Sequence, residues 1–316
     1  MLRFRIEGHS LGNPLKRLLV TGGHGFVGQW VQRRAPPIGA ADGFQIALPA
    51  ADFDLLDSAR VDATLAASRP DAILHLAAQS NVAASFKDPA GTFRVNAMGT
   101  LALFEGVKRA GLRPRIVLVS SGDVYGLVPA AEMPIAETRL PMPRNPYAAS
   151  KVAAEALAYQ WSQSEGLEVV IARSFNHIGA GQADTFAISG FARQIAEIEA
   201  GKRDAFIDAG DIDATRDFTH VSDIVEGYFT LFAKGASGEV YNLCSGTDRR
   251  IRDLLERMLG ISGVRAAIRQ DPARLRPSEQ RAVRGNNGKI SRLGWRPQVE
   301  MDAALREVLD DWKKRI

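Results

Sequence analysis

The sequence predicts an α/β protein built on a doubly wound parallel sheet, with a smaller, discontinuous C-terminal lobe. The first observation is an alternation of short apolar runs with helix-like segments, which is typical of parallel strands covered by helices on both faces. The second is a glycine-rich turn placed directly after the first apolar run. The expected strands are 17–20, 45–48, 72–76, 115–119 and 168–171, and the expected helices are 26–34, 58–68, 89–110 and 147–165.

Composition indicates a globular protein of ordinary type. The 316 residues are 46% hydrophobic, which is ample for a packed core. No apolar run is long enough to span a membrane, and the first residues do not resemble a secretory signal, so we expect a cytoplasmic protein. The single cysteine, Cys244, fits a reducing compartment and is expected to be a buried structural thiol. Residues 1–16 show no strong period and are expected to be an extension without a role in the chemistry.

The charge distribution is uneven. The formal net charge is +4, but residues 249–316 carry 17 basic groups against 9 acidic ones. Nucleic acid is one interpretation of such a bias, yet the arginines are scattered and lack interleaved aromatic residues. We therefore expect an anionic small ligand, and neither nucleic acid, membrane nor metal as a partner.

The alternation weakens after Arg173. The pattern then predicts a loop at 179–181, a helix at 185–200 and a return to the sheet across 216–244, with one helix and a strand at 240–243. A ligand should bind beyond the C-terminal ends of the strands, in the crevice between two lobes. The predicted division is 17–176 plus 217–245 for the nucleotide-binding domain, 177–216 plus 246–316 for the substrate lobe, and 1–16 for the extension.

The glycine-rich turn predicts a Rossmann-type dinucleotide site. Gly22 makes the tight turn, Gly25 lets the backbone approach a pyrophosphate, and Gly28 allows close helix packing. Phe26 and Val27 begin the helix whose N-terminus faces the phosphates. A turn required only for packing is the alternative, but the preceding strand and following helix argue against it.

The second strand bears on the choice between NAD and NADP. It ends in Leu48 and Pro49 without the carboxylate that would bind a ribose 2′-hydroxyl, which favours NADPH while leaving NADH possible. Arg33 and Arg34 either bind a 2′-phosphate or are solvated charges on a helix.

Further cofactor contacts are expected at the ends of the next strands. Asp54, followed by Leu55, is placed to accept a hydrogen bond from the adenine amino group. The backbone of Leu76, Ala77 and Ala78 is expected to pass the cofactor.

Three residues form the predicted catalytic set. Tyr147 and Lys151 are four residues apart and share a helix face, and Ser121 ends the fourth strand. A lysine ammonium stabilises phenolate, so we expect Lys151 to lower the pKa of Tyr147 and to bond the nicotinamide ribose. Ser121 would hydrogen-bond the same substrate oxygen and orient it for hydride transfer.

Together these motifs resemble the extended short-chain dehydrogenase/reductase superfamily. The resemblance covers about residues 17–300 and implies NAD(P) in the larger lobe, a nucleotide-diphosphate sugar in the smaller one, and Asn96 among the cofactor-site residues. It also implies a homodimer through a four-helix bundle of 89–110 and 147–165. The motifs are Thr-Gly-x-x-Gly-x-x-Gly, His-Leu-Ala-Ala, Asn96 with Gly99-Thr100, Ser121, Val124-Tyr125-Gly126, Asn145-Pro146-Tyr147 with Lys151, and Arg216-Asp217-Phe218. The apolar residues that would either pair the protomers or form ordinary core are Leu101, Leu103, Phe104, Ala154, Leu157 and Trp161.

The runs 173–179 and 276–279 are similar to the branch of the superfamily that acts on GDP-mannose derivatives. By that resemblance Asn176 contacts the sugar-side phosphate, Arg216 and Arg276 bind the diphosphate, and Glu279 binds the GDP ribose. A salt bridge between Arg276 and Glu279, and a loop-fixing amide for Asn176, are the structural alternatives.

Gly122 and Asp123 separate a reductase from a dehydratase within this branch. Sugar-nucleotide 4,6-dehydratases carry glutamate immediately before the Val-Tyr-Gly motif, to remove the C5 proton. Asp123 is one methylene shorter and is retained as a substrate contact, while Gly122 offers no acid for loss of water. The resemblance therefore implies reduction of the C4 ketone of GDP-4-keto-6-deoxy-D-mannose to GDP-D-rhamnose.

Three alternatives stay open. A 6-deoxy-D-talose product differs only in the face of the ketone that receives hydride. An epimerase or dehydratase of the same superfamily would consume no net cofactor, and a dinucleotide sensor would have no need for the catalytic set.

Overall fold

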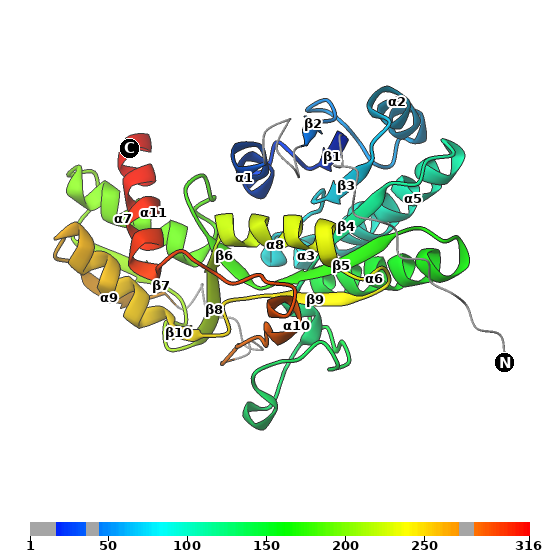
Figure 1. Ribbon diagram of the computed structural model, residues 1–316. Helices are drawn as coiled ribbons and strands as arrows, with labels where there is room; N and C mark the ends of the chain where they lie inside the picture. The colour runs from blue at the N-terminus through cyan, green and yellow to red at the C-terminus, as the bar shows by residue number, and fades with distance from the viewer. Residues whose placement is uncertain (1–16, 36–43, 272–280) are drawn as a thin grey trace.

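The computed structural model describes residues 17–35, 44–271 and 281–316. The predicted extension 1–16 and the predicted ligands Arg276 and Glu279 lie outside the described residues. A six-stranded parallel sheet forms the centre of the molecule, in the order β2-β1-β3-β4-β5-β9 (Figure 1). Its strands are β1 (Arg17–Thr21), β2 (Gln45–Ala47), β3 (Ala72–His75), β4 (Arg115–Ser121), β5 (Val169–Ser174) and β9 (Val240–Leu243).

Helices cover both faces of this sheet, which confirms the predicted fold class. Side chains of consecutive strand residues point to opposite faces, so Leu18 packs in one core and Leu19 in the other. One face carries α1 (Phe26–Arg34), α8 (Val221–Lys234) and α10 (Gly288–Ser291). The other carries α2 (Ser58–Ser68), α5 (Gly99–Arg109) and α6 (Pro146–Ser164).

The helix predicted at 89–110 is interrupted. It consists of α4 (Pro89–Phe93), a π-helical segment (Arg94–Met98) and α5. The wider turn holds Asn96, whose side chain accepts a bond from the Gln79 N–H at 2.8 Å and donates to Ser150 Oγ at 2.9 Å. The interruption thus ties the loop after β3 to α6. A second short helix, α3 (Val82–Lys87), is not predicted because six residues show no clear period.

The smaller lobe has its own apolar core, formed by helices α7 (Ala187–Glu199), α9 (Ile251–Ser262) and α11 (Met301–Arg315) (Figure 1). The strand β8 (Thr215–His220), which the sequence places with the main sheet, pairs instead with β6 (Asn176–Ile178) and β10 (Asp248–Arg250). Of the stretch 216–244, only α8 and β9 return to the main sheet, because the local sequence of a strand does not specify its pairing partner. We keep the two-lobe division as a proposal, which the separate core supports. The strands β7 (Phe206–Ala209) and β11 (Ala267–Gln270) form a further parallel pair.

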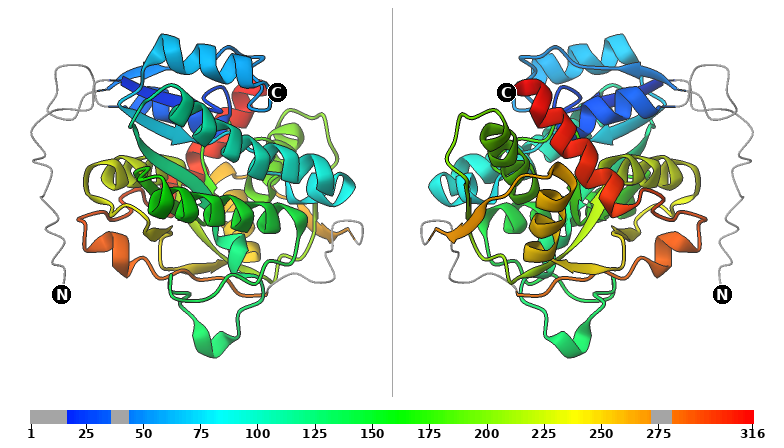
Figure 2. Two further views of the ribbon diagram at one scale, coloured as in Figure 1. Left: turned by 90° about the vertical axis from the view of Figure 1, so that its right-hand side faces the viewer. Right: turned by 90° about the vertical axis from the view of Figure 1, so that its left-hand side faces the viewer.

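A long segment, 126–143, projects from the body of the molecule and carries a 3₁₀ turn at Ala130–Glu132 (Figure 2). It leaves through Gly126, whose φ of 63° suits glycine and whose added Cβ would collide with the Met142 carbonyl. It is anchored at Ile135, which bridges to Gly285. Cys244 is buried, as predicted. Among the helices of the described ranges, none is long and apolar enough to cross a bilayer.

Candidate active site

The glycine turn between β1 and α1 forms a cradle against the end of β3. Gly22 has a φ of 73°, and a Cβ added there would lie 2.7 Å from the Ala77 amide nitrogen. A Cβ at Gly28 would lie 2.4 Å from the Gly23 carbonyl oxygen. Gly25 precedes α1 and has no side chain to cap it, so the first-turn N–H groups face outward for an anion. The turn therefore fits a dinucleotide pyrophosphate.

The other predicted cofactor residues lie around this cradle. Leu76 and Ala78 are half-buried at the end of β3, while Leu55 is buried against Gly99 and supports the site by packing. Asp54 is exposed, and its Oδ1 accepts a hydrogen bond from the Leu56 N–H at 2.9 Å. Its carboxylate remains on the surface where an adenine would approach.

Arg33 and Arg34 do not lie near the phosphate turn. They occupy the last turn of α1, about 12 Å along the helix from its N-terminus. Arg34 pairs with Glu226 of α8 at 3.4 Å, and the Arg33 guanidinium lies 5.5 Å from the ring centre of Trp30. This arrangement favours the predicted alternative in which they are surface charges.

A buried hydrogen-bond chain fixes the loop beside the cradle. The Thr21 hydroxyl lies 2.7 Å from His75 Nδ1, and His75 Nε2 lies 3.1 Å from Thr100 Oγ1. Thr100 donates its proton to the Asn96 carbonyl, so we assign the ring proton of His75 to Nε2. Burial, and then the charge of Lys151, lower the pKa of His75 to about 3. His75 is therefore a neutral connector between β1, β3 and α5.

The structure brings Ser121, Tyr147 and Lys151 together. Asn145 caps α6 by accepting a bond from the Ala148 N–H at 2.7 Å, and Pro146 occupies the first turn. This start places Tyr147 next to Ser121 at the end of β4. One turn further on, Lys151 is buried and its Nζ donates to the Val119 carbonyl at 2.9 Å.

The protonation state of Tyr147 differs from the prediction. Burial first, and then the negative charge of Asp123, raise the pKa of Tyr147, while the hydrogen bond with Ser121 opposes them. In this arrangement Lys151 Nζ donates to the Val119 carbonyl, and burial and Asp123 outweigh any stabilisation of the Tyr147 phenolate. Burial also lowers the pKa of Lys151 to about 8. Tyr147 thus carries its proton at neutral pH, which suits a general acid.

Gly122 and Asp123 lie in a 3₁₀ turn (Gly122–Tyr125) directly after Ser121. A Cβ at Gly122 would lie 3.0 to 3.1 Å from the ring of Phe175, which is buried. A side chain at this position would therefore require that ring to shift by a few tenths of an ångström. Asp123 is exposed, and its N–H donates to Ser121 Oγ at 3.1 Å.

Besides Ser121 and Asp123, two predicted substrate residues that the structure describes lie on the three-stranded sheet. Asn176 begins β6 and is exposed, while Arg216 of β8 is mostly buried and donates to the Thr215 carbonyl at 2.8 Å. Sequence reasoning missed Arg249, which the antiparallel pairing of β8 and β10 places directly opposite Arg216. Arg249 donates to the Phe218 and Thr247 carbonyls and to Ser245 Oγ, so both arginines have partners within the protein. The strand pairing that brings the two arginines together is not visible in the sequence.

A second missed residue is His177 of β6. Its ring stacks on Phe26 of α1, with centroids 6.0 Å apart and planes at 5°, and His177 Nδ1 lies 3.0 Å from the Phe175 carbonyl. His177 therefore joins the smaller lobe to the start of the phosphate-binding helix. Its place in the run 173–179 was the available signal.

Asp217 shapes the loops next to the arginine pair. Its buried carboxylate accepts bonds from the backbone N–H groups of Ser245 at 2.7 Å, Gly246 at 3.0 Å and Gly285 at 3.1 Å, and from the Ser245 hydroxyl at 2.6 Å. Burial raises the pKa of Asp217, and these bonds oppose the rise. Asp217 therefore has a structural role beside Arg216.

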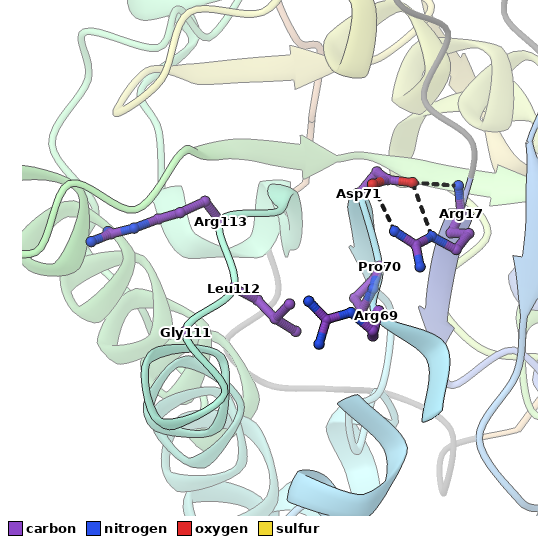
Figure 3. A pocket seen from close by; sticks show the side chains of 7 residues that line it. All are labelled: Arg17, Arg69, Pro70, Asp71, Gly111, Leu112 and Arg113. Carbon is purple, nitrogen blue, oxygen red and sulfur yellow. Dashed lines mark hydrogen bonds and ion pairs between the residues drawn. The ribbon is translucent and has the colours of Figure 1, made fainter. Parts of the chain in front are cut away.

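A cavity of about 350 Å³ lies at the other end of the main sheet, where the strands begin (Figure 3). It is formed at the amino ends of β1 and β3, where Arg17 bonds Asp71 through two guanidinium nitrogens. The catalytic set lies at the carboxyl ends, so this cavity is separate from it. Its lining residues are Arg17, Arg69, Pro70, Asp71, Gly111, Leu112 and Arg113.

Comparisons with known proteins agree with this geometry. Residues 43–308 match the family model described as GDP-mannose 4,6 dehydratase. The chain is 44% identical over 303 residues to the GDP-6-deoxy-D-mannose reductase of Pseudomonas aeruginosa, covering 95% of this chain and 98% of that protein. The structure of RMD from Pseudomonas aeruginosa complexed with NADPH superposes with a TM-score of 0.89 at 42% identity, covering 95% of this chain and 99% of that one. DesIV, a dTDP-glucose 4,6-dehydratase from Streptomyces venezuelae with NAD and TYD bound, gives a TM-score of 0.81 at 28% identity, covering 95% and 97%.

Proposed function

Because the chain belongs to the GDP-mannose 4,6-dehydratase family of extended short-chain dehydrogenase/reductases, we propose that it reduces GDP-4-keto-6-deoxy-D-mannose at C4 with NADPH. The product is GDP-D-rhamnose. The observation that carries this proposal is a complete Ser121, Tyr147 and Lys151 set next to Gly122, which provides no acidic side chain. The near full-length similarity to a GDP-6-deoxy-D-mannose reductase supports the same reaction.

The residues act on the ketone oxygen. Bound NADPH supplies the hydride that is transferred to C4. Ser121 donates a hydrogen bond to the oxygen and orients the carbonyl, and Tyr147 delivers the proton that completes the carbinol. The positive charge of Lys151 stabilises the phenolate that remains on Tyr147. The raised pKa of Tyr147 favours this direction, since reduction begins with a protonated phenol.

The GDP moiety is proposed to bind in the smaller lobe. Arg216 and Arg249 offer two guanidinium groups to the diphosphate, and Asn176 faces the sugar-side phosphate. Arg276 and Glu279 retain the roles that the family resemblance implies. We expect C4 of the bound sugar to lie beside Ser121 and Tyr147.

The reaction is tested by cofactor consumption. Purified protein mixed with GDP-4-keto-6-deoxy-D-mannose and NADPH is expected to lose absorbance at 340 nm, with one NADPH oxidised per carbinol formed. NMR of the product assigns its configuration at C4, and the rhamno isomer is expected. Turnover without net NADPH oxidation would instead indicate an epimerase or dehydratase.

We also propose that the protein is a homodimer in the cytoplasm. Four of the six apolar residues considered for the dimer, Leu103, Phe104, Ala154 and Trp161, are buried in the core of one chain. A different apolar set is exposed on the short helices packed against α6 and on α6 itself, and it offers a contact for a second copy. These residues are Phe86, Phe93, Val95, Met98 and Tyr159. A cytoplasmic location is supported by the single cysteine, which has no partner for an internal disulfide.

Replacing Met98 with aspartate is expected to convert the dimer to a monomer. Met98 is 51% exposed, so the charge costs little in the isolated chain but would be buried at the contact. Light scattering after size-exclusion chromatography measures the mass. The control is Leu140→Asp on the projecting segment, at a side chain that is 77% exposed, which should remain dimeric. A monomeric native protein, or a dimeric Met98→Asp variant, would refute the contact.

A further inference from the structure

A buried ion pair lies behind the catalytic set. Glu155 of α6 accepts bonds from Arg173 of β5 through both carboxylate oxygens, at 2.9 Å to Nε and 2.6 Å to Nη2. The Ser120 hydroxyl donates to the same carboxylate at 2.5 Å. The side chains of Glu155 and Arg173 are only 7% and 5% exposed. Such a pair is costly to bury, and apolar residues of similar volume often give equal or greater stability. Its presence here therefore calls for a role other than stability.

The position of Glu155 indicates that role. Tyr147, Lys151 and Glu155 follow one another at four-residue spacing, so all three lie along one face of α6. Lys151 lies between the phenol and the carboxylate and is itself buried. An ammonium group loses hydration when it is buried, and a nearby carboxylate compensates for that loss.

We propose that Glu155, held in place by Arg173 and Ser120, is a positioning residue that keeps Lys151 positively charged inside the buried site. This inference rests on the proposed reductase function, since the charge on Lys151 stabilises the phenolate formed during reduction. It concerns a residue that touches neither substrate nor cofactor and acts through Lys151.

Within the described part of the chain, no other charged or titratable group around Lys151 supplies the negative charge that would keep its ammonium protonated. Burial is the largest influence on the pKa of Lys151, and Glu155 is the group that opposes it. His75 faces Lys151 from β3 but is neutral, because its own pKa falls to about 3. The remaining groups do not act on Lys151 directly. Asp123 and Tyr228 interact with Tyr147, and Arg173 interacts with Glu155.

A second set of contacts fixes the ion pair from behind. The Arg173 guanidinium lies 4.7 Å from the ring centre of Tyr125. The Tyr125 hydroxyl donates to Asn242 Oδ1 at 2.7 Å, and Asn242 Nδ2 donates to the Ile135 carbonyl at 2.9 Å. Arg173 is thereby held between the catalytic helix and the anchor of the projecting segment. Because Arg173 is fixed on both sides, the carboxylate of Glu155 is also held in one orientation.

The test is the pH profile of Glu155→Gln, which removes the charge and preserves the shape. Activity requires a protonated Lys151, so the native kcat/KM should fall as pH rises through the pKa of about 8. Without the carboxylate the ammonium loses its proton more easily, and the falling limb should move to lower pH. A displacement of about one unit would reduce kcat/KM about fivefold at pH 8 and leave it nearly unchanged at pH 6.

A direct measurement separates this inference from the proposed function. The ¹⁵Nζ signal of Lys151, assigned by its absence in Lys151→Arg, reports the titration without substrate. It should move to lower pH in Glu155→Gln and return part of the way in Glu155→Asp. A shifted titration in a protein that does not reduce the GDP-sugar would support Glu155 and refute the function.

The controls separate charge from structure. Arg173→Lys keeps a positive charge and breaks the two-point contact with Glu155. It should lower the melting temperature, while the fall of kcat/KM with rising pH should stay at nearly the same pH. If Glu155→Gln does not fold, Glu155→Gln with Arg173→Met removes the unpaired charge and should show the same displacement. If neither the pH profile of kcat/KM nor the ¹⁵Nζ titration of Lys151 shifts in the folded variant, Glu155 has a structural role only.

Discussion

Replacement of Tyr147 by phenylalanine is expected to lower kcat by about 10² to 10⁴-fold, the usual contribution of a positioned general acid. The phenol is the group placed to protonate the ketone oxygen, and its raised pKa keeps the proton available at neutral pH. Phenylalanine preserves the ring packing at the start of α6. Single-turnover absorbance at 340 nm measures the chemical step, and NADPH fluorescence measures cofactor binding, which should change by only a few-fold.

The matched control for this change is Tyr159→Phe. Tyr159 lies on the same helix, is 58% exposed and is remote from Ser121 and Lys151. It should turn over at the native rate. Retention of native kcat in Tyr147→Phe would remove Tyr147 from the mechanism, and an equal loss in both variants would point to the helix instead of the phenol.

Replacement of Gly22 by alanine is expected to weaken NADPH binding by about 100-fold. The backbone at Gly22 has a φ of 73°, where a Cβ costs about 1–2 kcal/mol, and that Cβ would meet the Ala77 amide at 2.7 Å. The free protein is expected to relieve these effects by moving the turn out of its binding conformation. Restoring the cradle for NADPH would then cost about 3 kcal/mol, which corresponds to about 100-fold in Kd. Calorimetric titration with NADPH measures the loss.

Gly111→Ala is the control for backbone strain. Gly111 has a similar φ of 63° but no atom within 4 Å of an added Cβ, and it lies at the far edge of the sheet. It should lower the melting temperature slightly and leave the NADPH affinity unchanged. Equal losses of affinity in both variants would show that strain alone, and not the cradle, accounts for the effect.

Local features of the fold were predictable from the sequence. The helices α1 and α2 begin and end at the predicted residues, because a glycine turn precedes the first and Asp57 caps the second by accepting from Ala59 and Arg60. Long-range features were not predictable. The placement of Arg249 opposite Arg216 depends on a strand pairing that no periodicity reveals. The same holds for β8, whose largely polar sequence, Thr215–His220, does not indicate which sheet it joins.

In the candidate catalytic set, too, local features were predictable from the sequence and long-range features were not. Ser121, Tyr147 and Lys151 were predictable because strand end and helix spacing are local properties. The charge state of Tyr147 was not, since it depends on burial and on the field of Asp123. The ion pair of Glu155 with Arg173 was likewise hidden, because it joins α6 to a strand that begins after the helix ends.

The ring of Phe175 constrains how this chain can diverge. It lies between two glycines: a Cβ at Gly122 would come within 3.0 Å of the ring, and a Cβ at Gly285 within 2.8 Å. A side chain introduced at either glycine would push the ring towards the other glycine. The two glycines therefore act together in fixing the position of the Phe175 ring, and we expect a larger residue at position 122 to be better tolerated when position 175 carries a smaller side chain.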